Sequence, residues 1–222
     1  MFTTLWKIGL HFLPWSYFAA NTVTPTTCLT TSSTLLALVS CFDTYTVPEN
    51  FYTATTYNAA QPTTTQRADW RVLVQRLLSV DNGNCAAVSI PSSLQGIYGV
   101  ASFQSYCVLY EITSSAGIYD KGWGFVVVPS SRSQISRHVH ISAPHPQYDT
   151  GTVEQAAAIF QTTGLNSLLV AGRTRTAYLE PSNCIVPTSP TQGYYMTDPA
   201  HNNVSPTCEI RKFVYQWFLP PS

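Results

Sequence analysis

One histidine in this chain stands between two prolines and four residues before an aspartate. The segment reads Pro144-His145-Pro146, and Asp149 follows it. Proline fixes its own φ angle and restricts the preceding residue to extended conformations, which stiffens the backbone around the imidazole. A stiffened histidine with a carboxylate nearby can bind a metal ion, or the two can act as a general base and the group that orients it.

A second pair of such residues lies in the later segment "TDPAH", which contains Asp198 and His201. Two histidines and one carboxylate, with a fourth position left for water, form a common hydrolytic zinc site. Asp198 and His201 are therefore candidates for a third ligand that would complete a metal site with His145 and Asp149.

Two arginines in "GRTRTAY", Arg173 and Arg175, are candidate substrate-binding residues. A guanidinium group matches a carboxylate with two parallel hydrogen bonds, so these residues predict a substrate that carries a carboxylate. Only 10% of the residues are charged, against about 25% in an ordinary soluble domain, which makes each arginine more informative.

Each candidate also has a plainer interpretation. His145 can be a structural loop residue, Asp149 a helix cap, and the two arginines solvated surface charges. His138 and His140 point to the same side of one strand and could be ligands, but a polar strand face is the favoured interpretation for them.

The elements around the histidine follow from hydrophobic periodicity. We expect a helix from Thr152, with Thr152 and Gln155 as a capping box and Gly164 as its end. Residues rich in β-branched and aromatic side chains predict strands at 96–102, 106–112, 123–129, 137–143 and 167–171.

Residues 137–171 then read as a right-handed βαβ unit with parallel strands, in an α/β fold with a mixed sheet and flanking helices. The loops after both strands of this unit leave the sheet at one edge. Functional sites of such sheets form beyond the carboxyl ends of the strands. The sequence thus predicts that His145, Asp149, Arg173 and Arg175 converge there.

The rest of the chain divides by composition into a leader, an arm, a domain and a tail. We expect a signal peptide at 1–20, a Thr-rich arm at 21–66, the α/β domain at 67–203 and an irregular tail at 204–222. Within the arm we expect a linker, a short helix at 33–40 capped by Ser32 or Ser33, and a surface loop at 44–66. Asp69 is expected to cap the next helix.

Composition also constrains compartment and partners. The six cysteines have no C-x-x-C spacing, which favours disulfides in an oxidising compartment; their pairing is left open. The net charge is zero and no basic stripe is present, so nucleic acid is not an expected partner. No apolar run is long enough to predict a membrane span. The protein is expected to be secreted.

A resemblance is carried by the segments "ADWRVLVQRLLS", "PSSLQGIYGVASF", "SYCVLYEI", "GWGFVVVP", "ISAPHPQYDTGTVEQAAAIFQTTG", "SLLVAG" and "TDPAH". Over about residues 33–203, these segments resemble a family of uncharacterised secreted proteins of fungi and bacteria. More distantly, the histidine at a strand end, the following acid and the later histidine are similar to zinc carboxypeptidase-like amidohydrolases. This resemblance implies that His145, Asp149 and His201 bind Zn²⁺, and Asp198 is then the candidate catalytic base.

Together these features predict a secreted, metal-dependent hydrolase of the amidohydrolase or peptidase type. Its substrate would be a small molecule or peptide with a carboxylate. The alternative is a non-catalytic secreted binding or surface protein in which the Pro-His-Pro loop is only a rigid turn.

Overall fold

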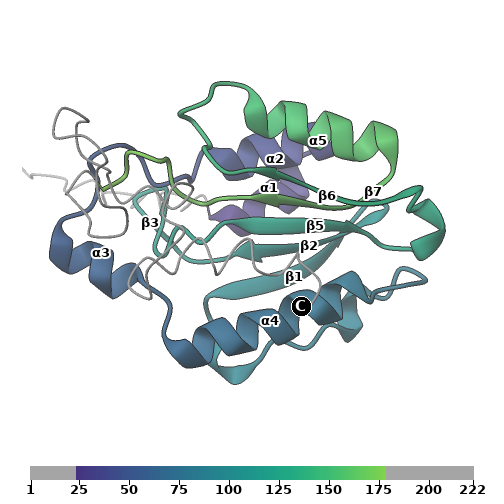
Figure 1. The fold of residues 1–222 in the computed structure, drawn as a ribbon, viewed down its shortest axis with the longest axis horizontal. Coiled ribbons are helices and arrows are strands. Elements are labelled where there is room, and N and C mark those ends of the chain that lie inside the picture. Colours follow the sequence, from purple (N-terminus) through teal and green to yellow (C-terminus); the bar gives the residue numbers. More distant parts are fainter. Residues whose placement is uncertain (1–23, 179–222) are drawn as a thin grey trace, which may run out of the picture.

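The computed structural model describes residues 24–178. Their centre is a five-stranded sheet with the strand order β1-β2-β5-β7-β6 (Figure 1). Neighbouring strands are antiparallel except β6 and β7, which are parallel, so the predicted α/β fold with a mixed sheet is confirmed. The strands are β1 (Tyr98–Phe103), β2 (Tyr106–Glu111), β5 (Phe125–Pro129), β6 (Arg137–Ala143) and β7 (Leu165–Val170). A two-stranded ribbon, β3 (Ser114–Ser115) with β4 (Ile118–Tyr119), lies between β2 and β5 in the chain.

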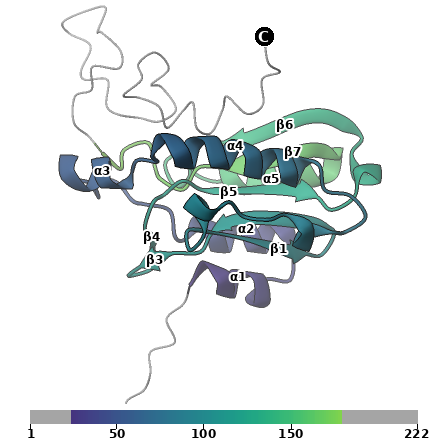
Figure 2. The same cartoon turned by 90° about the horizontal axis from the view of Figure 1, so that it is seen from below.

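Helices cover both faces of the sheet (Figures 1 and 2). One face carries α1 (Pro25–Thr31), α2 (Leu35–Asp43) and α5 (Thr152–Thr163), whose apolar side chains form one core cluster. The other face carries α4 (Thr64–Leu78), which belongs to a second cluster. The short helix α3 (Ala54–Ala60) lies at one end.

Strand β2 shows why the central strands are apolar throughout. Val108 and Tyr110 belong to the cluster on the α2 and α5 face, whereas Cys107 and Leu109 belong to the cluster on the α4 face. Side chains alternate between the faces of a sheet, so a strand covered on both sides needs apolar residues at every position. Glu111, at the end of this strand, is therefore an unusual buried residue.

The predicted βαβ unit is present. Strands β6 and β7 pair in parallel with Ile141 opposite Leu168 and Ala143 opposite Val170, and α5 connects them. The expected apolar face of α5 is buried, and the helix ends at Gly164, whose φ angle of 62° suits the left-handed conformation of a helix C-terminus.

The amino-terminal part corrects the expectation of a linker and a loop. Residues 25–31 are helical, with Pro25 in the first turn, and the Cys28–Cys41 disulfide joins this helix to α2. Helix α2 is capped by Thr34, not by Ser32 or Ser33. Seven-residue helices have too few turns to show a clear period, and their burial depends on tertiary contacts that the sequence does not display.

The caps predicted for two helices were also wrong, although α5 begins at Thr152 as expected. Thr63 and Gln66 form the capping box that starts α4, so Asp69 lies inside that helix and accepts a hydrogen bond from Ser93. Helix α5 is preceded by Gly151 with a φ angle of 78° and has no side-chain cap. The Thr152 hydroxyl donates to the carbonyl of Asp149 and so does not form the expected capping box.

Candidate functional site

The loop after β6 brings His145 and Asp149 into direct contact. Nδ1 of His145 and Oδ2 of Asp149 are 2.8 Å apart. The backbone explains this separation, because the N–H of Asp149 donates to the carbonyl of His145 and closes one turn. A carboxylate only accepts hydrogen bonds, so Nδ1 carries the proton in this contact. Loss of that proton would let Nδ1 and Oδ2 hold a metal ion together, whereas Nε2 is buried.

This loop is anchored at the end of α2. Gln147 has a φ angle of 61°, in the left-handed region, and its side-chain amide donates to the carbonyl of Asp43 at 2.6 Å. Burial raises the pKa of Asp43, the hydrogen bond from Thr46 lowers it, and the charge of Glu154 raises it further. The histidine loop is therefore hydrogen-bonded to the backbone of Asp43, a partly buried acidic residue at the end of α2.

The loop after β7 reaches the same place through Arg175. Its guanidinium lies 4.8 Å from the centre of the Tyr148 ring, and Tyr148 belongs to the histidine loop. This is within the range of a cation–π contact. His145 and Asp149 are thus in contact, and Arg175 reaches the same loop through Tyr148, at the carboxyl edge of β6 and β7.

The site is open on one side. The side chain of His145 is 12% exposed and that of Asp149 is 44% exposed, while Tyr148 is 50% exposed. A ligand can therefore approach the acid and the tyrosine, whereas the imidazole is held largely within the protein. Tyr148 was not among the predicted site residues; an aromatic residue between the histidine and the aspartate is the signal that would have found it.

Arg173 has a different environment. It is 2% exposed, its Nε donates to the carbonyl of Gly122 at 3.1 Å, and its Nη2 donates to the carbonyl of Lys121. The rings of Tyr52 and Tyr57 lie 5.1 and 5.6 Å from its guanidinium carbon. The structure therefore places Arg173 inside the fold, away from the exposed side of the site.

His138 and His140 do not join this site. Ser167 Oγ lies 2.7 Å from Nδ1 of His140, and the amide nitrogen of Asn166 lies 3.3 Å from its Nε2. An amide nitrogen only donates, so Nε2 accepts, and Nδ1 donates to the serine; the serine is therefore not activated as a nucleophile. Burial lowers the pKa of His140, and the neighbouring His138 lowers it further, which favours the neutral imidazole that these contacts need.

The described residues contribute two candidate metal ligands at this edge. Residues 24–178 contain no group of three or more His, Cys, Asp or Glu side chains that could hold a metal ion. The predicted third ligand, His201, and the predicted base, Asp198, lie outside the described residues. Two tetrahedral zinc ligands lie about 3.3 Å from each other, so the 2.8 Å between His145 and Asp149 needs little widening to admit an ion.

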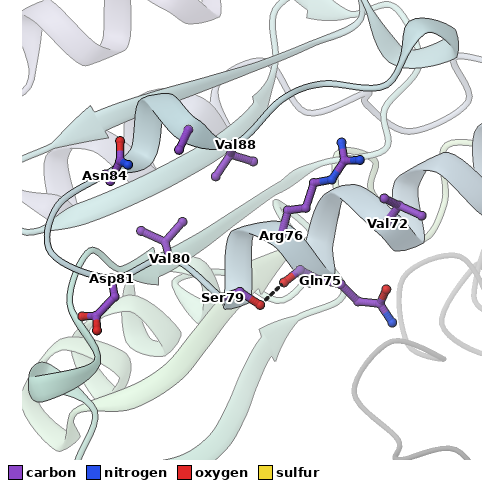
Figure 3. Close-up of a pocket in the computed structure, with 9 residues that line it drawn as sticks. Val72, Gln75, Arg76, Ser79, Val80, Asp81, Asn84 and Val88 are labelled. Atoms are coloured by element: carbon purple, nitrogen blue, oxygen red, sulfur yellow. Dashed lines mark hydrogen bonds between the residues drawn. The ribbon is translucent and has the colours of Figure 1, made fainter.

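A separate groove lies on the opposite side of the sheet, along α4 (Figure 3). Its volume is about 430 Å³, and Val80 and Val88 contribute apolar surface to it. The one acid in this groove, Asp81, accepts hydrogen bonds from the backbone N–H groups of Arg132 and Asn82, which lower its pKa. Its carboxylate thereby links the turn after α4 to the segment after β5. The groove is lined by Val72, Gln75, Arg76, Ser79, Val80, Asp81, Asn84, Ala87 and Val88, and includes none of the predicted site residues.

No known protein family, curated protein or solved structure matches this chain. The resemblance described above is thus a prediction without support from comparison, and the site has to be interpreted from its own geometry.

Proposed function

We propose that this protein is an extracellular metal-dependent hydrolase, with its site at the carboxyl edge of β6 and β7. The observation that supports the proposal most is the 2.8 Å contact between His145 and Asp149, in a loop that Arg175 contacts through Tyr148. Catalytic constellations in α/β proteins commonly form at this position of the sheet.

The residues of the chain have distinct roles in this proposal. Without an ion, Asp149 orients the imidazole of His145 by accepting from Nδ1. Zn²⁺ would replace that proton between His145 and Asp149, would have His201 as a third ligand, and would supply a water of lowered pKa. Asp198 would serve as the general base.

Arg175 is the proposed substrate-binding group. Its guanidinium is held over the exposed Tyr148 ring, next to the histidine loop. A guanidinium group matches a carboxylate with two parallel hydrogen bonds, and stacking on an aromatic ring fixes the plane of the guanidinium. The proposed substrate is therefore an amide or peptide with a carboxylate near the scissile bond. Arg173, the other predicted arginine, is proposed to support the loop and not to contact the substrate.

Extracellular location is supported by two disulfides in the described residues, Cys28–Cys41 and Cys85–Cys107. Such bonds persist in oxidising compartments and are rare in the cytosol. Among the helices of residues 24–178, none is both long and apolar enough to cross a membrane.

The direct test compares metal content and hydrolysis in matched histidine variants. The purified full chain is loaded with Zn²⁺, dialysed, and assayed on a panel of N-acyl amino acids and short peptides. We expect one bound zinc and hydrolysis in the wild type, and loss of both in His145→Ala. His138→Ala is the control, because His138 is exposed on β6 and takes no part in the site.

Retention of zinc and activity by His145→Ala would contradict the proposal. A folded wild type that binds no zinc and hydrolyses none of the panel would favour the alternative, a non-catalytic secreted binding protein. Circular dichroism and a urea midpoint measured on each variant separate loss of the site from loss of the fold.

A further inference from the structure

Two buried residues of opposite charge, Glu111 and Arg173, form hydrogen bonds with the backbone of the short segment 121–123. The carboxylate of Glu111, at the end of β2, is 0% exposed. Its Oε1 accepts from the N–H of Lys121 at 2.6 Å and from that of Gly122 at 3.3 Å, and its Oε2 accepts from the N–H of Trp123 at 3.0 Å. The carboxylate thus takes the donors of three consecutive peptide groups.

Arg173 binds the carbonyl side of the same segment. It donates to the carbonyls of Lys121 and Gly122, as described above. The acid and the guanidinium are therefore linked through the peptide groups that both of them bind. Neither charge is solvated, so each depends on these backbone dipoles to be tolerated in the interior.

The backbone next to segment 121–123 is in contact with the loop after β7. A Cβ atom on Gly124 would lie 2.0 Å from the carbonyl oxygen of Val170, and one on Gly172 would lie 2.5 Å from the nitrogen of Gly124. Contacts this close are available only to glycine, so the two segments cannot shift independently of each other.

The loop after β7 carries this constraint to the site. Val47 pairs with Arg173 of this loop in an isolated parallel bridge. The N–H of Val47 donates to the carbonyl of Gly172, and its carbonyl accepts from the N–H of Thr174, both at 2.9 Å. Arg175 is the next residue along, and it stacks on Tyr148 beside His145. A continuous set of contacts therefore runs from Glu111 and Arg173 to the guanidinium of Arg175.

We infer that Glu111 and Arg173 are positioning residues, which lock the segment 121–123 against the loop after β7 and thereby set the position of Arg175. The inference rests on the proposed function only in treating Arg175 as part of the site. Neither residue is assigned a contact with a substrate.

Glu111 gives the pair a pH dependence. Burial raises its pKa to about 7, while hydrogen bonds from Lys121, Trp123 and Gly122 and the charge of Arg173 act in the opposite direction. Burial raises the pKa values of Tyr98 on β1, Tyr119 on β4 and Tyr52, and the charge of Glu111 raises them further. When the segment opens and hydrates the carboxyl group, its pKa falls towards the ordinary value of 4.5. Opening is therefore favoured as the pH rises through this range.

Amide hydrogen exchange, measured by NMR on the full chain without metal or substrate, tests the inference. After correction for intrinsic exchange rates, we expect the opening equilibrium constant to rise about tenfold or more between pH 5.5 and pH 8. This rise is expected at the amides of Lys121, Gly122, Trp123 and Thr174. The amide of Gln155, at the start of α5, is the internal control and should not change. In Glu111→Gln the dependence on pH should vanish at all four positions.

Two results would overturn the inference. If 121–123 respond to pH but Thr174 does not, the pair supports its own segment and positions nothing at the site. If the wild type shows no pH dependence at any of these amides, Glu111 does not control opening. Glu154→Gln, which removes a half-buried acid from α5, is the matched control and should behave as the wild type. The exchange experiment measures neither zinc binding nor hydrolysis. Its result can therefore be interpreted even if the proposed function is wrong.

Discussion

The guanidinium of Arg175 lies 4.8 Å from the centre of the Tyr148 ring and thereby joins the loop after β7 to the loop after β6. These residues are 27 positions apart in the chain, and the parallel pairing of β6 with β7 brings their loops to one edge. The contact therefore holds the two loops of the proposed site together.

This contact should appear as a measurable coupling. We expect a double-mutant cycle of Tyr148→Ala and Arg175→Gln, followed by urea unfolding, to give a coupling of about 0.5–1 kcal/mol, as cation–π pairs at exposed positions do. Tyr148→Phe keeps the aromatic face and should retain the coupling. A cycle with no coupling would show that the stacking contributes nothing to stability in solution.

Global stability should depend on pH through Glu111. Its pKa is raised to about 7 in the folded protein from an ordinary value of 4.5, so the folded state binds more protons between these values. Stability is therefore highest below about pH 4.5 as far as this group is concerned, and falls as the pH rises to about 7. Between pH 5.5 and pH 8 we expect Glu111 to account for a loss of about 2 kcal/mol in the free energy of unfolding.

The measurement is urea denaturation of the wild type and of Glu111→Gln at both pH values. The difference between the two proteins should itself change by this amount. An identical pH dependence in both would mean that Glu111 titrates normally in the folded state.

Gly124 should tolerate no side chain. Its φ angle is 88°, and a Cβ atom would lie 2.0 Å from the carbonyl oxygen of Val170. We expect Gly124→Ala to lower the free energy of unfolding by about 3 kcal/mol or more. Gly83→Ala is the control: its φ angle is similar, 76°, but nothing lies within 4 Å, so only the left-handed backbone cost of about 1–2 kcal/mol applies. Equal losses would argue against the backbone contact.

The Cys85–Cys107 disulfide should be a main source of stability. It joins two residues 22 apart in the chain, and both cysteines are buried. Replacing both by alanine removes the constraint on the unfolded chain and should cost about 3 kcal/mol in urea denaturation. Peptide mapping without reductant should recover this pair and Cys28–Cys41; any other pairing of these four cysteines would contradict the structure.

The elements and contacts that could be predicted from the sequence are those that depend on residues close together in the chain. The limits of β6 and the apolar face of α5 were predicted correctly, because strand and helix periods act within a few residues. The convergence of His145, Asp149 and Arg175 followed from the parallel crossover. The start of α4 was missed although Thr63 and Gln66 form a recognisable capping box, since Asp69 offered a competing cap.

The environment of Arg173 could not be predicted in this way. Its burial depends on Lys121 and Gly122, about fifty residues earlier, and on Glu111 at the end of an apolar strand. Two arginines two residues apart looked equivalent in the sequence, yet the fold buries one and stacks the other on a tyrosine. Only the tertiary contacts distinguish the buried arginine from the one stacked on the tyrosine.

Anomalous diffraction at the zinc edge, on crystals of the zinc-loaded full chain, shows whether His145 and Asp149 bind a metal ion. We expect one strong anomalous peak about 2 Å from a ring nitrogen of His145 and from an oxygen of Asp149, and we expect it to disappear in His145→Ala. A zinc-loaded crystal with no peak at this loop, or with the His145–Asp149 hydrogen bond intact and the ion elsewhere, would contradict this expectation.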